Sequence, residues 1–205
     1  MESVLDRVIK QNTENVNLLK TKDYNIFSVL QIQSKEVLIC RMIADLLNPR
    51  GQHGAGAEYL KIFLRDCLGM KKMDTKLAGH AIVTAEYAID DERRIDIVIE
   101  IGSYFLPIEV KIYAADQKSQ CFDYYQYAKR RDAQAKVYYL TLDGHRPGKD
   151  STSSGSQSVP EEDIVCLSFR EHILNWLKAC KSCENTGMVP ILEQFIQNIE
   201  QISGY

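Results

Sequence analysis

The chain has 205 residues, of which 45% are hydrophobic and 26% are charged, and its formal net charge is −3. These values are typical of an ordinary globular protein and exclude binding of nucleic acid through a basic field over the whole surface. No stretch approaches the roughly 20 apolar residues of a membrane span, and the polar N-terminus lacks the apolar region of a secretory signal. We therefore expect one cytoplasmic domain over residues 1–205, with no membrane partner.

Hydrophobic periodicity, caps and chain breakers predict the secondary structure. Six segments are expected to be helices: 2–20, about 35–48 with Ser34 as N-cap, about 57–68, 116–131, 169–183 and 190–202. Five segments are expected to be strands: 80–89, 93–101, 104–113, 136–142 and 164–169. The Gly-, Ser- and Pro-rich segment at about 143–162 is expected to be an exposed, mobile loop. This order predicts an α/β (α+β) fold with a mixed central β-sheet flanked by helices and a core over about residues 30–170.

Six cysteines are expected to be free thiols, because no secretory signal points to an oxidising compartment. Cys180 and Cys183 form a C-x-x-C motif, but no second Cys or His pair accompanies it. A zinc or redox site usually needs that second pair, so we interpret the motif as a helix end.

Two successive strands are expected to bring a pair of acids together. The isoleucines at alternate positions from Ile95 to Ile101 are predicted to share one face, which places Asp96 on the opposite face. The Gly102–Ser103 loop fits a two-residue hairpin and pairs the last isoleucine with Tyr104. Counting outward from that pair places Asp96 directly across from Glu109.

Opposed like charges destabilise a hairpin, so two facing carboxylates favour a cation between them. Magnesium is suited to this position, because it binds one or two carboxylates together with water and phosphate oxygens. Lys111, one pleat beyond Glu109, would add a positive charge beside the reacting group. The alternative is a solvated face on which the two acids pair with Lys111 and with Arg94, its partner across the hairpin.

Three further elements bear on this site. Glu36 falls on the buried stripe of the second predicted helix, where an unpaired charge is costly, although an acid in a first helical turn is also favourable by itself. Glu86 is either a third acid at the cluster or an exposed strand residue. On the helix after Lys111, a polar face could orient water or phosphate, or could form hydrogen bonds at the core edge: Gln117, Gln120, Cys121 and Tyr124.

The ordered set of motifs resembles the PD-(D/E)XK nuclease superfamily. Asp96 is followed by Glu109-Val110-Lys111 and by a Q-x-x-x-Y element, Gln120 to Tyr124, as in its exonuclease-like branches. Blocks from about residue 36 to 180 look like those of an uncharacterised microbial and phage branch. Two departures stand out: Ile95 replaces the proline of the family name, and Ile39–Cys40 replaces a His-Ser pair of some relatives, so any role of those side chains is open.

The resemblance implies a restriction-endonuclease-like αβββαβ core with extra helices at both ends, and phosphodiester hydrolysis in DNA. It implies one or two Mg²⁺ or Mn²⁺ ions held by Asp96, Glu109, the carbonyl of Val110, and Glu36 or Glu86. Lys111 would position the attacking water or stabilise developing charge. Gln120 and Tyr124 would buttress the site or contact the phosphate.

Other readings stay open. The chain could be a binding module on the same fold with weak or no catalysis, or a metal-dependent nuclease acting on RNA. His53 matches a recurring family position, but a lone loop histidine is more often structural. Short basic runs at 70–76, 128–131 and 144–149 could contact phosphates, although most such runs are solvated surfaces. Oligomeric state is undetermined, and a dimer is one option.

Overall fold

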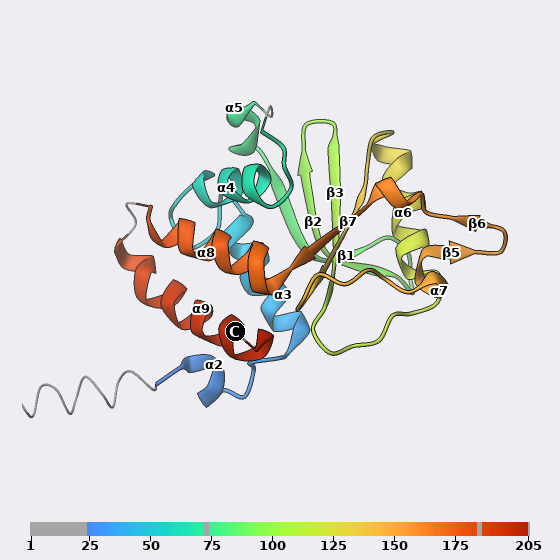
Figure 1. Cartoon of the computed structure of the whole chain (residues 1–205). Coiled ribbons are helices and arrows are strands. Elements are labelled where there is room, and N and C mark those ends of the chain that lie inside the picture. Colours follow the sequence, from blue (N-terminus) through green and yellow to red (C-terminus); the bar gives the residue numbers. More distant parts are fainter. Residues whose placement is uncertain (1–23, 72–73, 184–185, 205) are drawn as a thin grey trace, which may run out of the picture.

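The computed structural model describes residues 24–71, 74–183 and 186–204, so the helix predicted over 2–20 lies outside the described part. Its centre is a five-stranded sheet of order β1-β2-β3-β4-β7 (Figure 1). The first three strands are antiparallel, whereas β3, β4 and β7 run parallel. The strands are β1 Ile82–Ala88, β2 Arg94–Ile101, β3 Tyr104–Lys111, β4 Val137–Thr141 and β7 Ile164–Ser168. The predicted mixed sheet flanked by helices is confirmed.

The longer helices flank the sheet on both faces. They are α3 Glu36–Leu47, α4 Glu58–Asp66, α6 Gln120–Arg131, α8 Leu174–Lys181 and α9 Val189–Ser203. Short helices are α2 Ile26–Val29, α5 Thr75–Ala78, α7 Lys149–Thr152, the 3₁₀ turns Glu161–Asp163 and Thr186–Met188, and the π-turn Phe169–Ile173, which leads directly into α8. Within the described residues, none of the helices combines the length and the apolar character that a membrane span requires.

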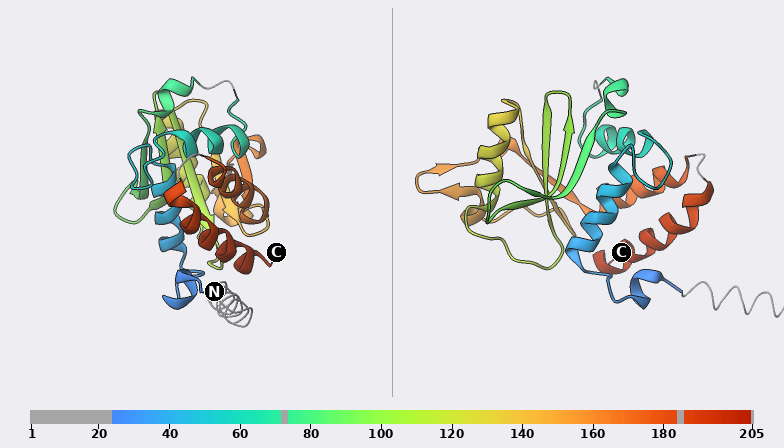
Figure 2. Two further views of the ribbon diagram at one scale, coloured as in Figure 1. Left: turned by 90° about the vertical axis from the view of Figure 1, so that its left-hand side faces the viewer. Right: turned by 180° about the vertical axis from the view of Figure 1, so that it is seen from behind.

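Two cores lie on opposite faces of the sheet. The main core joins the sheet to α3, α4, α8 and α9, which gather on one side (Figures 1 and 2). On the other face α6 packs its buried side chains against β2, β3 and β4. Because strands bear apolar residues toward both helical layers, the strands that carry the candidate acids are buried on both faces.

Two helices begin later than predicted. Helix α3 starts at Glu36 with Lys35 as its N-cap, because Ser34 lies in a turn closed by a hydrogen bond from Lys35 N to the carbonyl of Ile32. Helix α6 starts at Gln120, because Ser119 adopts a left-handed backbone (φ 57°) that interrupts any helix beginning further upstream.

The segment predicted as an exposed, mobile loop at about 143–162 contains regular structure. It contains α7 and a small hairpin formed by β5 Ser153–Ser154 and β6 Gln157–Ser158. Ser151 and Val159 are buried in it, and Ser151 Oγ accepts a hydrogen bond from Cys121 N in α6 (3.3 Å). Most residues of this segment are exposed, as predicted, but it also contains short elements that pack against α6.

Candidate active site

The hairpin between β2 and β3 sets the register of the candidate site. Ile101 pairs with Tyr104, and the pairing continues outward to Ile97 with Ile108, which confirms the predicted register. Gly102 has a left-handed φ of 58°, as a tight two-residue turn requires. The next step of this register places Asp96 across from Glu109.

The regular alternation of β2 ends at Asp96. Ile97, Ile99 and Ile101 lie in the main core, whereas Ile95 lies in the second core with Val98. The expectation that all four isoleucines share one face was therefore wrong. In the same region the pairing of β1 with β2 keeps its register but omits Glu86 and Asp96, and the Glu86 backbone is left-handed (φ 52°). Such conformations are uncommon for residues other than glycine and tend to occur at functional sites.

Asp96, Glu109 and Lys111 form a compact charged group between the sheet and its flanking helices. Lys111 Nζ lies 2.5 Å from Glu109 Oε1, and both side chains are buried. Asp96 Oδ2 accepts a hydrogen bond from the Val110 main-chain N–H at 2.7 Å. The carboxyl groups of Asp96 and Glu109 also affect the pKa of each other. The predicted pairing of two acids and one ammonium thus has a geometric counterpart in the structure.

Burial and mutual repulsion shift the ionisation of these groups. Burial, followed by the negative charge of Asp96, raises the pKa of Glu109 well above its usual value. Burial also raises the pKa of Asp96, although the Val110 N–H opposes this shift. Burial alone would lower the pKa of Lys111, but the charge of Glu109 and the hydrogen bond to it outweigh burial and raise the pKa. A proton on Glu109, or a bound divalent cation, would relieve the repulsion between the two acids.

One atom of this group tests whether a divalent ion fits. Glu109 Oε2 is buried and receives no hydrogen bond from any described residue. As a carboxylate oxygen it is costly in that state, and a proton or a cation would satisfy it. Carboxylate oxygens are the ligands that Mg²⁺ and Mn²⁺ prefer, so the donor set fits such an ion.

The other predicted metal ligands have protein partners. Glu36 Oε2 accepts a hydrogen bond from Ile112 N (2.8 Å), and Glu86 Oε2 pairs with Arg41 at 2.6 Å. Consequently no three His, Cys, Asp or Glu side chains among the described residues are already arranged as a metal site. Burial raises the pKa of the Cys40 thiol, and the charges of Asp96, Glu36, Glu109 and Glu86 raise it further.

Gln120 and Tyr124 bind each other and the neighbouring strand. Gln120 Nε2 donates to the Tyr124 hydroxyl (3.1 Å), which in turn donates to the carbonyl of Arg94 (2.5 Å). Both side chains are buried, and Arg94 lies two residues before Asp96. This geometry makes the Q-x-x-x-Y element a brace between α6 and β2. Gln117, by contrast, lies outside the helix and is exposed.

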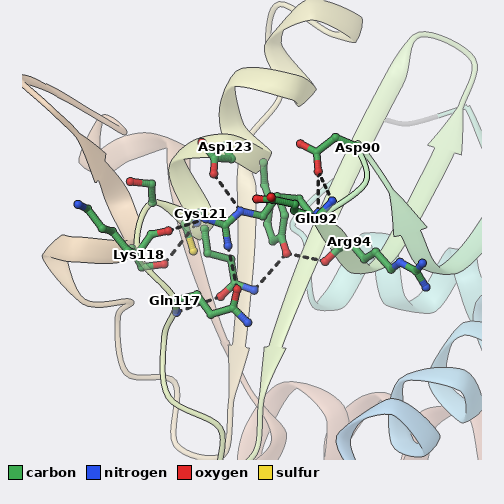
Figure 3. A network of polar contacts seen from close by, with 12 residues as sticks. Asp90, Glu92, Arg94, Gln117, Lys118, Cys121 and Asp123 are labelled. Carbon is green, nitrogen blue, oxygen red and sulfur yellow. Dashed lines mark hydrogen bonds and ion pairs between the residues drawn. The ribbon is translucent and has the colours of Figure 1, made fainter.

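Arg93 is a site residue that the sequence analysis missed. Its guanidinium donates to Gln117 Oε1 (2.8 Å), to the carbonyl of Lys118 (2.6 Å) and to Asp123 Oδ2 (3.1 Å). Figure 3 shows this network, which ties the loop after β3 to α6 and to the start of β2. The adjacent Arg94 side chain points away from the network in the same view. The pair "RR" at 93–94 gave no signal, because sequence alone does not separate a buried clamp from an exposed cation.

His53 has a structural environment. It is buried, its Nδ1 accepts from the Ala55 N–H (3.0 Å), and its Nε2 lies 2.9 Å from the carbonyl of Asn48. Its ring stacks on Tyr59, with centroids 4.8 Å apart. These contacts fix the loop between α3 and α4.

Several cations of the predicted basic runs interact with other groups of the protein. Lys129 pairs with Asp163, and Arg131 lies over the rings of Tyr87, Phe105 and Tyr127. Arg146 donates to the carbonyl of Glu161 (3.2 Å). The six cysteines are free thiols, and Cys180, the first of the C-x-x-C motif, is buried near the end of α8.

The comparisons with known proteins bear on the whole of this arrangement. Neither a search of curated proteins nor one of solved structures found a significant match. A family model described as the PD-(D/E)XK nuclease superfamily matches residues 24–197, which include both strands of the acid pair and the helix that braces them. The chain therefore belongs to the PD-(D/E)XK nuclease superfamily.

Proposed function

We propose that this protein is a metal-dependent nuclease that hydrolyses phosphodiester bonds in DNA. The observation that carries the proposal is the buried Glu109, which pairs with Lys111 and has one oxygen without a donor, next to Val110, whose N–H binds the Asp96 carboxylate. A buried and a half-buried acid on neighbouring strands, kept at a cost in stability, suit a divalent cation. Membership of a nuclease superfamily supports the same reaction class.

Asp96, Glu109 and the Val110 carbonyl would hold the ion, with Glu36 and Glu86 as the nearest additional acids. When bound, Mg²⁺ or Mn²⁺ lowers the pKa of a water molecule and neutralises charge on the phosphate. Lys111 supplies the ammonium group that orients a water or stabilises negative charge on the phosphate oxygens. Gln120 and Tyr124 act through β2, because their hydrogen bonds hold the main chain next to Asp96.

The main alternative is a nucleic-acid or partner-binding module that has lost turnover. A module without catalysis has no need to oppose two carboxylates in a buried position, so the intact Asp96, Glu109 and Lys111 favour the enzyme. A second alternative is hydrolysis of RNA. The acids would act in the same way on RNA, and contacts to the 2′-hydroxyl would determine whether RNA or DNA is the substrate.

The test compares four substrates with either Mg²⁺ or Mn²⁺: supercoiled, linear and single-stranded DNA, and RNA. We expect cutting of at least one DNA form that EDTA abolishes and that Lys111→Ala loses. Lys61→Ala is the matched control, because Lys61 lies on α4 and, among the described residues, forms its ion pair with the surface residue Glu58. Activity that survives EDTA, or that is undiminished in Lys111→Ala, would contradict the proposal. Cutting of RNA alone would replace DNA by RNA as the substrate.

A further inference from the structure

The loop between β3 and α6 carries an aromatic side chain in an exposed position beside the acid pair. Tyr113 is 68% exposed, the highest value among the large hydrophobic residues that the structure describes. It lies two residues beyond Lys111, and the next two residues, Ala114 and Ala115, are small and exposed. A single exposed aromatic is unremarkable on a surface, so its meaning depends on how the loop is held.

The loop is anchored on both sides of Tyr113. On the near side, the Ile112 N–H donates to Glu36 of α3 at 2.8 Å. On the far side, Asp116 accepts hydrogen bonds from the Tyr139 hydroxyl (2.7 Å) and from Gly148 N (2.7 Å). Arg93 then holds the end of the loop through the contacts drawn in Figure 3. The Tyr113 ring is thus presented from a fixed backbone.

Two exposed cations belong to neighbouring segments: Lys118 lies in the same loop, and Arg94 lies at the start of β2. Lys118 and Arg94 are exposed, and neither side chain forms an ion pair with a described residue. In Figure 3 the two side chains extend in opposite directions from the network around Arg93. Exposed cations and an exposed aromatic ring are the combination by which proteins hold single-stranded nucleic acid, with phosphates on the cations and bases on the ring.

We propose that Tyr113 stacks on an unpaired base next to the scissile phosphate, so that the preferred substrate is single-stranded or locally unpaired DNA. This inference rests on the proposed nuclease function and adds the substrate class to it. A base inside a duplex has both faces covered by its neighbours, so a stacking residue gains contact only where the base is unpaired or flipped out.

The test measures binding of a fluorescent single-stranded oligonucleotide, and of the same strand in a duplex, in a Lys111→Ala background that leaves the strand uncut. We expect Tyr113→Ala to weaken single-strand binding by roughly 5- to 150-fold, as for loss of one stacked base. Tyr113→Phe should keep the affinity, since the ring does the stacking. A 2-aminopurine base in the strand should be quenched by the parent protein and much less by Tyr113→Ala.

The matched control is Tyr104→Ala. Tyr104 is also exposed (39%) but starts the same strand, seven residues before Lys111 and hence about 23 Å away. Its removal should leave binding unchanged. Equal loss of single-strand and duplex binding in Tyr113→Ala, or no loss in either, would overturn the stacking role. Failure of the parent protein to bind any nucleic acid would overturn this inference and the proposed function together, whereas tight duplex binding insensitive to Tyr113 would overturn only this one.

Discussion

The hydroxyl of Tyr124 offers the sharpest test of how the site is braced. Tyr124 is buried, and its hydroxyl bridges Gln120 Nε2 at 3.1 Å and the Arg94 carbonyl at 2.5 Å. Tyr124→Phe keeps the ring and its packing and removes only the oxygen. The variant therefore isolates the bridge between α6 and β2.

The expected loss of stability follows from the two groups that lose their hydrogen-bond partner when the oxygen is removed. The Gln120 amide and the Arg94 carbonyl each lose a partner, and an unsatisfied buried polar group costs about 1–3 kcal/mol. Because Arg94 lies at the exposed margin of the strand, water can replace part of its loss. We expect the free energy of unfolding to fall by about 2 kcal/mol, which for a chain of this length lowers the melting temperature by roughly 4–8 °C.

Thermal and urea unfolding measure this change, and Tyr127→Phe is the matched control on the same helix. The Tyr127 hydroxyl accepts from Arg131 (2.8 Å) and lies 3.3 Å from the Tyr87 hydroxyl, but the side chain is half-buried and water can reach it. We expect a loss below about 1 kcal/mol there. If Tyr124→Phe unfolds at the same midpoint as Tyr127→Phe, the bracing argument is wrong. Lost activity with unchanged stability would instead indicate direct contact with the substrate.

Three further changes test other parts of the site. Mg²⁺ at a hundred times its Kd should stabilise the protein by about 2.7 kcal/mol, or roughly 5–11 °C in melting temperature. Differential scanning fluorimetry of Glu109→Gln should show no such shift, and an equal shift would remove Glu109 from the ligands. His53→Ala should lower the free energy of unfolding by about 1–3 kcal/mol, since two main-chain groups lose their partner; urea unfolding that matches the parent would count against a structural role. Arg93→Ala should speed hydrogen exchange of the amides of residues 113–119, and unchanged exchange there would show that the loop is held without Arg93.

The hairpin that carries the acid pair was predictable from sequence for a local reason. A two-residue Gly-Ser loop allows few backbone conformations. Once the pair of residues that flanks the loop is fixed, the cross-strand partner of each residue farther from the loop follows by counting. The alternation of apolar residues then identified β3, whose partners bury both of its faces. Predictions based on local geometry and on side-chain period were correct where no unusual backbone intervened.

The remaining differences have one kind of cause. Nothing in the residue types around Glu86 or Ser119 signals a left-handed backbone, yet the first coincides with the change of face in β2 and the second precedes the start of α6. The ordered structure at 143–162 depends on contacts with α6, which is distant in sequence. Arg93 and Arg94 have different roles that the sequence does not distinguish, because only the folded loop shows which of the two side chains it contacts.

The charged groups of the candidate site are better explained by function than by stability. A buried ion pair such as Glu109–Lys111 often contributes no more than apolar residues of the same volume would. Here the cost is higher, since a second acid, Asp96, adjoins the pair and one oxygen of Glu109 has no donor among the described residues. The left-handed Glu86 and the broken alternation at Asp96 fall at the same place. Departures from local rules that fall at the same place are typical of functional sites, and a divalent cation is the ligand that we propose for this donor set.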